Sequence, residues 1–263
     1  MKVHFLADEG KEASRDTFKR MTRAYGQTDL DKAEIIVPIG GDGLMLRALP
    51  LAQGRYVYGI VPEENNSTGF AMNPYPKDHD LKRDLDQVGF RLIAPLKVSF
   101  SKHANGGTQS LVKHAFNSAA LVSDSGQAAM FDFTHVTGKE KITTPIGGNG
   151  LVVSTGFGST GLNFTSGGAI LDIFSSQVVV TGINLFQPRS FGSRILARDR
   201  SDFVISWQEG RGKRPLRLDI DGLSNRDLAN GRIEIGPEKD ARNHAKIGFL
   251  EPNDSPFKHF MIS

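Results

Sequence analysis

The sequence predicts an α/β domain at its N-terminal end, followed by a second domain that is rich in β-strands. Over residues 1–94, short apolar runs alternate with helix-like segments, which is typical of a parallel α/β sheet. Over residues 95–250, many short β-branched runs are separated by turn residues, which indicates an antiparallel domain. The length of 263 residues fits two domains, at roughly 100–200 residues each.

The first domain is expected to contain both strands and helices. Its strands are short apolar runs, and its helices have helical composition or spacing. We predict strands at Val3–Ala7, Glu34–Ile39, Tyr56–Val61 and Phe90–Ile93, and helices at Ser14–Tyr25, Leu44–Leu51 and Lys77–Gln87. Ser14 is a candidate N-cap, since a serine side chain can accept a hydrogen bond from the first turn of a helix.

The second domain is expected to consist of short strands joined by tight turns. The predicted strands are Lys97–Phe100, Ala119–Val122, Met130–Val136, Leu151–Ser154, Val178–Thr181, Phe203–Trp207, Leu216–Ile220, Arg232–Ile235 and Ala245–Leu250. Asn105–Gly107, Thr137–Gly138 and Asn230–Gly231 are the clearest turn signals. Residues 251–263 carry several apolar side chains, and we expect this tail to pack back on the first domain.

Composition excludes several classes of function. The chain has no cysteine, which removes disulfide frameworks, thiol catalysis and iron–sulfur clusters. Its seven histidines are scattered without metal-ligand spacing, so we expect no dedicated metal site. A net charge of +3 suits a phosphorylated ligand but is too small to indicate nucleic acid. Without a long apolar run or a signal-peptide core, we expect a cytoplasmic protein that does not bind membranes.

Glycine is the unusual residue, with 29 among 263 residues, or about 11% against an ordinary value of about 7%. The first cluster, Gly40-Gly41-Asp42-Gly43, lies between a predicted strand and a predicted helix. In such a turn glycines let the backbone approach a phosphate, and the helix start offers N–H donors. Asp42 would repel phosphate, but it could orient a hydroxyl next to one. The alternative is a tight turn in which Asp42 caps the helix.

Three further glycine clusters follow. Gly147–Gly150 feeds a predicted strand, and residues 156–161 read GxGxxG, the fingerprint of a dinucleotide-binding Rossmann turn. Two glycines interrupt the helix that this fold would need, and the next strand lacks its acidic end residue, so a ligand loop or a plain turn is favoured. The last cluster, Asp219–Gly222, is typical of a β-turn.

Taken in order, these segments resemble the NAD kinase family. The matching segments are Gly40–Ala48 (GGDG-x-x-LRA in the family), Ser67–Phe70 (its GxLGF loop), Ala115–Asn117 (its NE motif), Gly148–Thr155, Gly158–Thr160 and Gly167–Leu171 (its DGLxVSTPTGSTAY…GGPIL block), and Asp221–Gly222 (its late DG). GGDG alone is shared with other kinases of lipids and sugars, so the ordered set carries the resemblance.

The resemblance implies a two-domain kinase that phosphorylates the adenosine-ribose 2′-hydroxyl of NAD to give NADP. ATP or polyphosphate would be the donor, Mg²⁺ would accompany ATP, and a homodimer or homotetramer is expected. Asp42 would be the catalytic carboxylate. The residues that would bind NAD are Gly41, Gly43, Phe70, Asn117, Ser118, Asn149, Thr160, Gly161, Leu162, Thr165 and Asn184, with Arg47, Ser154, Ser159 and Asp221 in supporting positions.

The chain departs from the family at polar positions. Ser118 replaces the glutamate of the NE motif, and Asn149 replaces the aspartate of DGL. The segment Ser154–Leu162 also lacks the proline and the tyrosine of the family block. A hydrogen bond to a charged group contributes about 1.5–3 kcal/mol, so these changes could weaken NAD binding. Two alternatives therefore stay open: a kinase that acts on another hydroxyl, of a lipid or a nucleoside, and a nucleotide-binding protein without catalysis.

Overall fold

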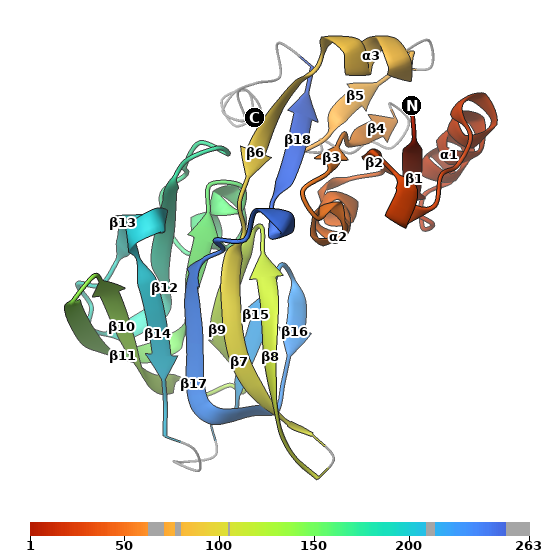
Figure 1. Ribbon diagram of the computed structural model, residues 1–263. Helices are drawn as coiled ribbons and strands as arrows, with labels where there is room; N and C mark the ends of the chain where they lie inside the picture. Colours follow the sequence, from red (N-terminus) through yellow and green to blue (C-terminus); the bar gives the residue numbers. More distant parts are fainter. Residues whose placement is uncertain (63–70, 77–79, 105, 209–213, 251–263) are drawn as a thin grey trace. The chain divides into compact units, whose positions relative to one another are not determined.

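The computed structural model describes residues 1–62, 71–76, 80–104, 106–208 and 214–250 (Figure 1). The chain divides into two compact units, one made of Met1–Ala94 together with residues from Asp240 onward, and one made of Pro95–Lys239. The predicted α/β class of the first unit and the β-rich class of the second are both confirmed.

The first unit is built on one seven-stranded sheet. Its strands are β1 (Val3–Ala7), β2 (Ile35–Ile39), β3 (Tyr56–Val57), β4 (Ile60–Pro62), β5 (Asn73–Tyr75), β6 (Gly89–Ile93) and β18 (Ala245–Phe249). They lie in the order β5-β4-β2-β3-β18-β6, and β1 pairs with β2. Every pair is parallel except β18 with β6. The central strand β2 is buried along its whole length, as expected for a parallel sheet covered by helices.

Among the described residues, three α-helices accompany this sheet: α1 (Glu12–Tyr25), α2 (Asp42–Ala52) and α3 (Leu81–Gln87). None of the described helices has the length and hydropathy needed to span a bilayer. The prediction that Ser14 caps α1 is wrong, because the helix begins at Glu12 and Ser14 is buried on its inner face. Asp80 caps α3 by accepting a hydrogen bond from the Arg83 N–H, so this helix starts later than predicted.

Two other predictions in this unit need correction or fall outside the described residues. The strand predicted at residues 56–61 is interrupted at Tyr58 and Gly59. A Cβ on Gly59 would lie 2.4 Å from Cε of Met45 and 2.6 Å from Sδ of Met72, so side chains close over the break. The tail at residues 251–263 and the start of the third predicted helix, residues 77–79, lie outside the described part of the chain.

Strand β18 was predicted in the second domain, and that assignment is wrong. It pairs in parallel with β3 and antiparallel with β6, both in the first unit. The buried side chain of Asn73 strengthens this connection, since its Nδ2 donates to the carbonyls of Gly59 and Gly248, 3.0 Å each. The second unit therefore ends before Asp240.

The second unit is built on one eleven-stranded sheet in which every pair is antiparallel. Its strands are β7 (Leu96–Ala104), β8 (Gly107–Ala115), β9 (Ser118–Ser123), β10 (Ala129–Thr137), β11 (Glu140–Thr155), β12 (Gln177–Gln187), β13 (Ser193–Ala197), β14 (Asp202–Ser206), β15 (Leu216–Ile220), β16 (Leu223–Asn225) and β17 (Leu228–Pro237). The order is β16-β15-β9-β11-β10-β14-β17-β7-β8, with β12 between β11 and β13.

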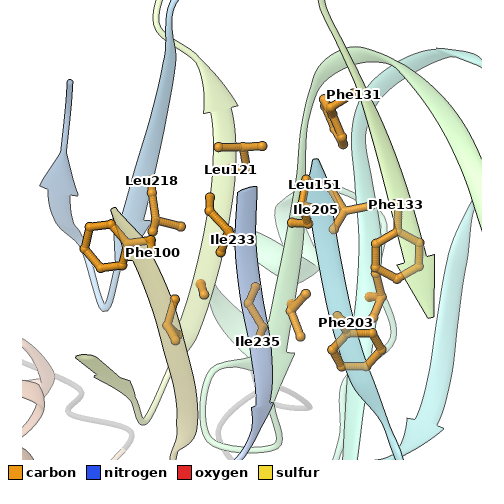
Figure 2. Close-up of a cluster of buried hydrophobic side chains, with 14 of the residues drawn as sticks. Phe100, Leu121, Phe131, Phe133, Leu151, Phe203, Ile205, Leu218, Ile233 and Ile235 are labelled. Carbon is orange, nitrogen blue, oxygen red and sulfur yellow. The ribbon is translucent and has the colours of Figure 1, made fainter. Parts of the chain in front are cut away.

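Alternate side chains of these strands form one hydrophobic core (Figure 2). The rings of Phe133 and Phe203 stack with centroids 5.8 Å apart, and Phe191 meets Phe133 edge-on at 5.7 Å. The turn predicted at Asn230–Gly231 is instead a bulge inside β17, where the register with β7 shifts. Both residues have positive φ there, at 64° and 54°, which Asn and Gly tolerate better than other residues.

Candidate functional site

The first candidate segment is the turn that connects β2 to α2. The Gly40 N–H donates to the Ile60 carbonyl (2.9 Å), which extends the sheet by one residue beyond β2. Gly41 occupies the N-cap position of α2, and a glycine has no side chain with which to cap the helix. The start of an eleven-residue helix presents backbone N–H groups and the positive end of the helix dipole, both of which favour an anion.

Asp42 is the first residue of α2, and it is held in place by the backbone. The Ala71 N–H donates to its Oδ1 at 2.8 Å. The alternative in which Asp42 caps the helix is wrong, since Gly41 holds that position and no side-chain cap bond forms. The carboxylate is half-buried, so its orientation is fixed while part of it stays accessible.

The two outer glycines of this turn differ in their surroundings. A Cβ on Gly40 would lie 3.0 Å from Cβ of Asp8 and 3.2 Å from Cδ2 of Leu44, so packing within the protein already favours glycine there. A Cβ on Gly43 would meet none of the described residues within 4 Å. Neither packing nor positive φ therefore explains the glycine at 43, whereas a ligand that approaches the backbone would. Arg47 is exposed on the same helix.

The second candidate segment is the turn at Phe116–Ser118, between β8 and β9. Its three successive N–H groups donate to the carboxylate of Asp221: Phe116 to Oδ2 at 2.8 Å, and Asn117 and Ser118 to Oδ1 at 2.8 Å and 3.0 Å. The Asp221 N–H donates in return to the Ser118 carbonyl (3.0 Å). Successive N–H groups that converge in this way form an anion-binding nest, and the protein fills it with its own carboxylate.

The β-turn predicted at Asp221–Gly222 is confirmed. In addition, the Asp221 carboxylate binds the N–H groups of the Phe116–Ser118 turn. The turn joins β15 to β16, with φ of 49° at Asp221 and 80° at Gly222. Two positive φ values are characteristic of a type I′ hairpin turn, for which Asp-Gly is a preferred pair. The hairpin therefore delivers the Asp221 side chain to the Phe116–Ser118 turn.

Burial raises the pKa of Asp221 to about 6, and the three hydrogen bonds from the turn oppose that shift. A carboxyl whose folded-state pKa lies above its unfolded value destabilises the fold as the pH rises from about 4 to about 6. The free energy of unfolding of the wild type, measured relative to Asp221→Asn, should therefore be higher at about pH 4.5 than at about pH 7. Urea unfolding of both proteins tests this, and a pH-independent difference would contradict it.

A glycine-rich loop follows β11 and packs against the same turn. The Thr155 hydroxyl donates to the Phe116 carbonyl (2.6 Å), and the Asn117 carbonyl accepts from the Thr155 N–H (3.1 Å) and the Ser154 hydroxyl (3.2 Å). A Cβ on Gly158 would lie 1.9 Å from Oδ1 of Asn117 and 2.1 Å from its carbonyl oxygen. Glycine at 158 is thus required by contact with the protein itself.

Asn163 organises the rest of this loop, and sequence reasoning missed it. Its fully buried amide donates from Nδ2 to the carbonyls of Ser159 and Ala169 (2.8 Å each), while Oδ1 accepts from the Thr181 hydroxyl (2.7 Å). A Cβ on Gly168 would lie 1.9 Å from this Oδ1. Ser159 is also buried and bonds to the Gly156 carbonyl and the Leu171 backbone. The sequence carries no signal for this role, because Asn163 stands between Leu162 and Phe164 and two of its three partners are backbone carbonyls.

The remaining predicted residues of this unit lie at the surface. In the short π-helical turn Ser159–Asn163, Gly161 and Leu162 are exposed and Thr160 is half-buried, and Thr165 just beyond it is exposed. Asn149 on β11 and Asn184 on β12 are exposed between the paired positions Gly148↔Leu185 and Gly150↔Ile183. Polar groups that could meet a ligand thus gather at the π-helical turn and at this strand pair.

Some predicted residues do not form a ligand surface, and one is not described. Ser154 and Ser159 are buried and serve the internal network. Phe70 lies outside the described residues. The Rossmann alternative for residues 156–161 is wrong, because β11 pairs antiparallel with its neighbours and a π-helical turn follows it. Within the described ranges, no group of three or more His, Cys, Asp or Glu side chains could hold a metal ion.

The chain is similar to bacterial NAD kinases over nearly its whole length. It is 30% identical over 241 residues to the NAD kinase of Xylella fastidiosa strain 9a5c, which covers 90% of this chain and 88% of that protein. It is 31% identical over 241 residues to the NAD kinase of Cereibacter sphaeroides strain ATCC 17029, and that alignment covers 90% of this chain and 89% of the relative. No protein-family profile matches the chain.

Two solved structures share the fold. The yeast NADH kinase complexed with NADH has a TM-score of 0.78 at 18% identity and covers 97% of this chain and 84% of its own. The NAD kinase from Archaeoglobus fulgidus in complex with ATP has a TM-score of 0.69 at 18% identity. The match covers 99% of this chain and 96% of the archaeal chain. The likeness therefore extends over both units of the fold.

Proposed function

Because the chain belongs to the NAD kinase family, we propose that it transfers a phosphoryl group to the 2′-hydroxyl of the adenosine ribose of NAD, giving NADP. The observation that carries the proposal is Asp42, whose carboxylate is oriented by the Ala71 N–H at a helix start that favours an anion. A hydroxyl acceptor and a phosphoryl group require these two features side by side.

Asp42 is proposed to orient the hydroxyl and to accept its proton late in the transfer. A carboxylate is too weak a base to deprotonate a sugar hydroxyl fully before reaction. In a loose phosphoryl-transfer transition state the proton needs to leave only as the new bond forms, so orientation is the main contribution. Gly41 and Gly43 leave the backbone accessible to phosphate, which the open space around Gly43 supports.

We propose ATP as the donor, as the ATP complex of the archaeal relative suggests, with polyphosphate as the alternative. Mg²⁺ usually binds through phosphate oxygens and one or two carboxylates, and Asp42 places a carboxylate at the glycine turn. Bound there, Mg²⁺ would neutralise charge on the transferred phosphoryl group. The residues fit an ion that arrives with ATP, and Asp42 would contribute a ligand to it.

The second unit is proposed to be the dinucleotide-binding domain. Asn117 and Ser118 would bind polar groups of the nucleotide. Asn149 and Asn184 would bind its hydroxyl or amide groups, and Asn149 stands where the family has an aspartate. Thr160, Gly161, Leu162 and Thr165 would line the pocket, supported by the exposure of all but Thr160. Phe70, which lies outside the described residues, would contact the adenine, as the family resemblance implies. NADH is a second substrate to test, because the yeast relative binds it.

We also propose a cytoplasmic homodimer or homotetramer. The large apolar side chains of Met130 and Phe186 are 48% and 51% exposed on β10 and β12, and both reach the position that a Cβ on Gly147 would take. Such a patch is often covered by another subunit. Light scattering of the purified protein would give the mass, and a monomer would remove this part of the proposal.

The activity test uses the purified protein with ATP, Mg²⁺ and NAD. We expect NADP to form, as measured by a coupled dehydrogenase specific for NADP, and parallel reactions replace ATP with polyphosphate or NAD with NADH. Tight binding of NAD without turnover under either donor would instead support a nucleotide-binding protein without catalysis. Phosphorylation of another hydroxyl substrate with no reaction on NAD would identify a different kinase of this superfamily.

A further inference from the structure

The carboxylate of Asp221 makes contacts that the β15–β16 hairpin turn does not require. A type I′ hairpin needs only the Asp-Gly backbone conformation, and asparagine serves that conformation equally well. Here the carboxylate is buried and accepts three hydrogen bonds from one turn of the chain. Burying a charge is costly unless its hydrogen bonds compensate. A buried carboxylate that the hairpin does not need therefore indicates that the position of the Phe116–Ser118 turn matters to the protein.

The Phe116–Ser118 turn is held from two sides. Its N–H groups bind Asp221, and its carbonyls at Phe116 and Asn117 accept hydrogen bonds from Thr155 at the end of β11. Gly158 also packs directly against Asn117, so the turn is restrained on this side as well. With donors and acceptors both engaged, the turn has little freedom to move, and the backbone that carries the Asn117 side chain is held in place.

We propose that Asp221 is a positioning residue for the dinucleotide site, holding the Phe116–Ser118 turn so that Asn117 is presented to the nucleotide in a fixed geometry. The inference rests on the proposed function, since Asn117 is one of the proposed nucleotide contacts. Asp221 itself does not touch the reacting atoms. Its effect should therefore appear in the binding of the dinucleotide rather than in the chemical step.

Asp221→Asn is the sharpest variant for this proposal. Its carbonyl oxygen can still accept from Asn117 and Ser118, as Oδ1 does now, while its amide would face the Phe116 N–H, donor against donor. We expect the KM for NAD to rise about tenfold, the effect of losing one hydrogen bond to a charged group. The kcat and the KM for ATP should stay within about twofold, because the chemical step does not use this turn.

Asp219→Asn is the matched control. Asp219 lies two residues earlier, on β15, and its carboxylate pairs with Arg217 (2.9 Å) instead of the Phe116–Ser118 turn. Like Asp221→Asn, the change removes one carboxylate from the β15–β16 hairpin, but it leaves the Phe116–Ser118 turn untouched. Its kinetic constants should match those of the wild type, and an equal rise in KM in both variants would overturn the proposal.

Thr155 tests the opposite side of the turn if Asp221→Asn does not fold. Thr155→Val keeps the shape of the side chain but removes the hydroxyl that donates to the Phe116 carbonyl. Thr155→Ser restores that hydroxyl. We expect a raised KM for NAD in the valine variant and recovery in the serine variant. A raised KM in both, or in neither, would contradict a positioning role.

Hydrogen exchange and calorimetry separate this proposal from the proposed activity. Amide exchange at residues 116–118 should be about tenfold faster in Asp221→Asn than in Asp219→Asn. If the wild type forms no NADP but binds NAD, weaker binding by Asp221→Asn upholds the positioning role while the proposed activity fails. Faster exchange with unchanged KM and Kd for NAD would overturn the positioning role alone. A wild type that does not bind NAD would overturn both.

Discussion

Replacing Asp42 with asparagine is expected to lower kcat for NADP formation by about two to four orders of magnitude, the usual contribution of a positioned acid or base. The amide keeps an oxygen that can accept the Ala71 N–H, so the side chain should hold its present orientation. What it loses is the negative charge and the capacity to take the proton of the acceptor hydroxyl. Steady-state kinetics with saturating ATP and NAD measure the effect.

Glu12→Gln is the control for Asp42→Asn. Glu12 is an exposed acid in the first turn of α1, as Asp42 is in the first turn of α2, so the change removes the same helix-dipole interaction, worth about 0.3–1 kcal/mol. The control should keep full activity. Circular dichroism should show both variants folded. Full activity in a folded Asp42→Asn protein would remove Asp42 from the mechanism.

The alternation of apolar strands and helices predicted the first unit because each element carries its own local signal. β2 is a continuous apolar run, and α2 follows its glycine turn. β18 was assigned to the wrong domain because its local pattern resembles that of the preceding antiparallel strands. Its partners β3 and β6 lie far away in sequence, and no local pattern reveals such pairing.

Strand length in the second unit was the least predictable feature. β11 runs from Glu140 to Thr155, but only Leu151–Ser154 had a clear strand pattern, because the exposed half is polar and Gly147–Gly150 resembles a turn. β8 was missed entirely, since most of its side chains are exposed or half-buried. Pairing with neighbouring strands, which composition does not show, makes these segments strands.

The candidate site was found through glycines, and the structure divides those glycines into two kinds. Gly43 has open space around it, as a ligand-facing position would. Gly156, Gly158 and Gly168 instead lie directly against Asp172, Asn117 and Asn163. A sequence motif does not distinguish close approach to a ligand from close approach to the protein's own backbone. The same limit hid Asn163, whose partners are mostly carbonyls that any residue could supply.

Gly158→Ala is expected to lower the free energy of unfolding by about 3 kcal/mol, at the upper end of the usual cost of overpacking. The backbone at Gly158 has φ of −96° and ψ of 0°, which alanine can adopt, so conformational strain is not the cause. The added methyl would overlap Asn117. Gly107→Ala, in the same unit, adds a methyl that meets none of the described residues within 4 Å and should leave stability near wild type. Urea unfolding of both variants measures the difference.

A double variant shows which atoms of Asn117 clash with the methyl group that Gly158→Ala adds. Asn117→Ala removes Oδ1, which lies 1.9 Å from the position of the new methyl, but it leaves the carbonyl oxygen at 2.1 Å. That carbonyl is held by Thr155 and Ser154, and the N–H groups of the turn are held by Asp221, so the backbone cannot easily retreat. Combining Asn117→Ala with Gly158→Ala should therefore restore only part of the lost stability. Complete recovery would mean that the turn moves freely, and it would contradict the rigid support that Asp221 is proposed to provide.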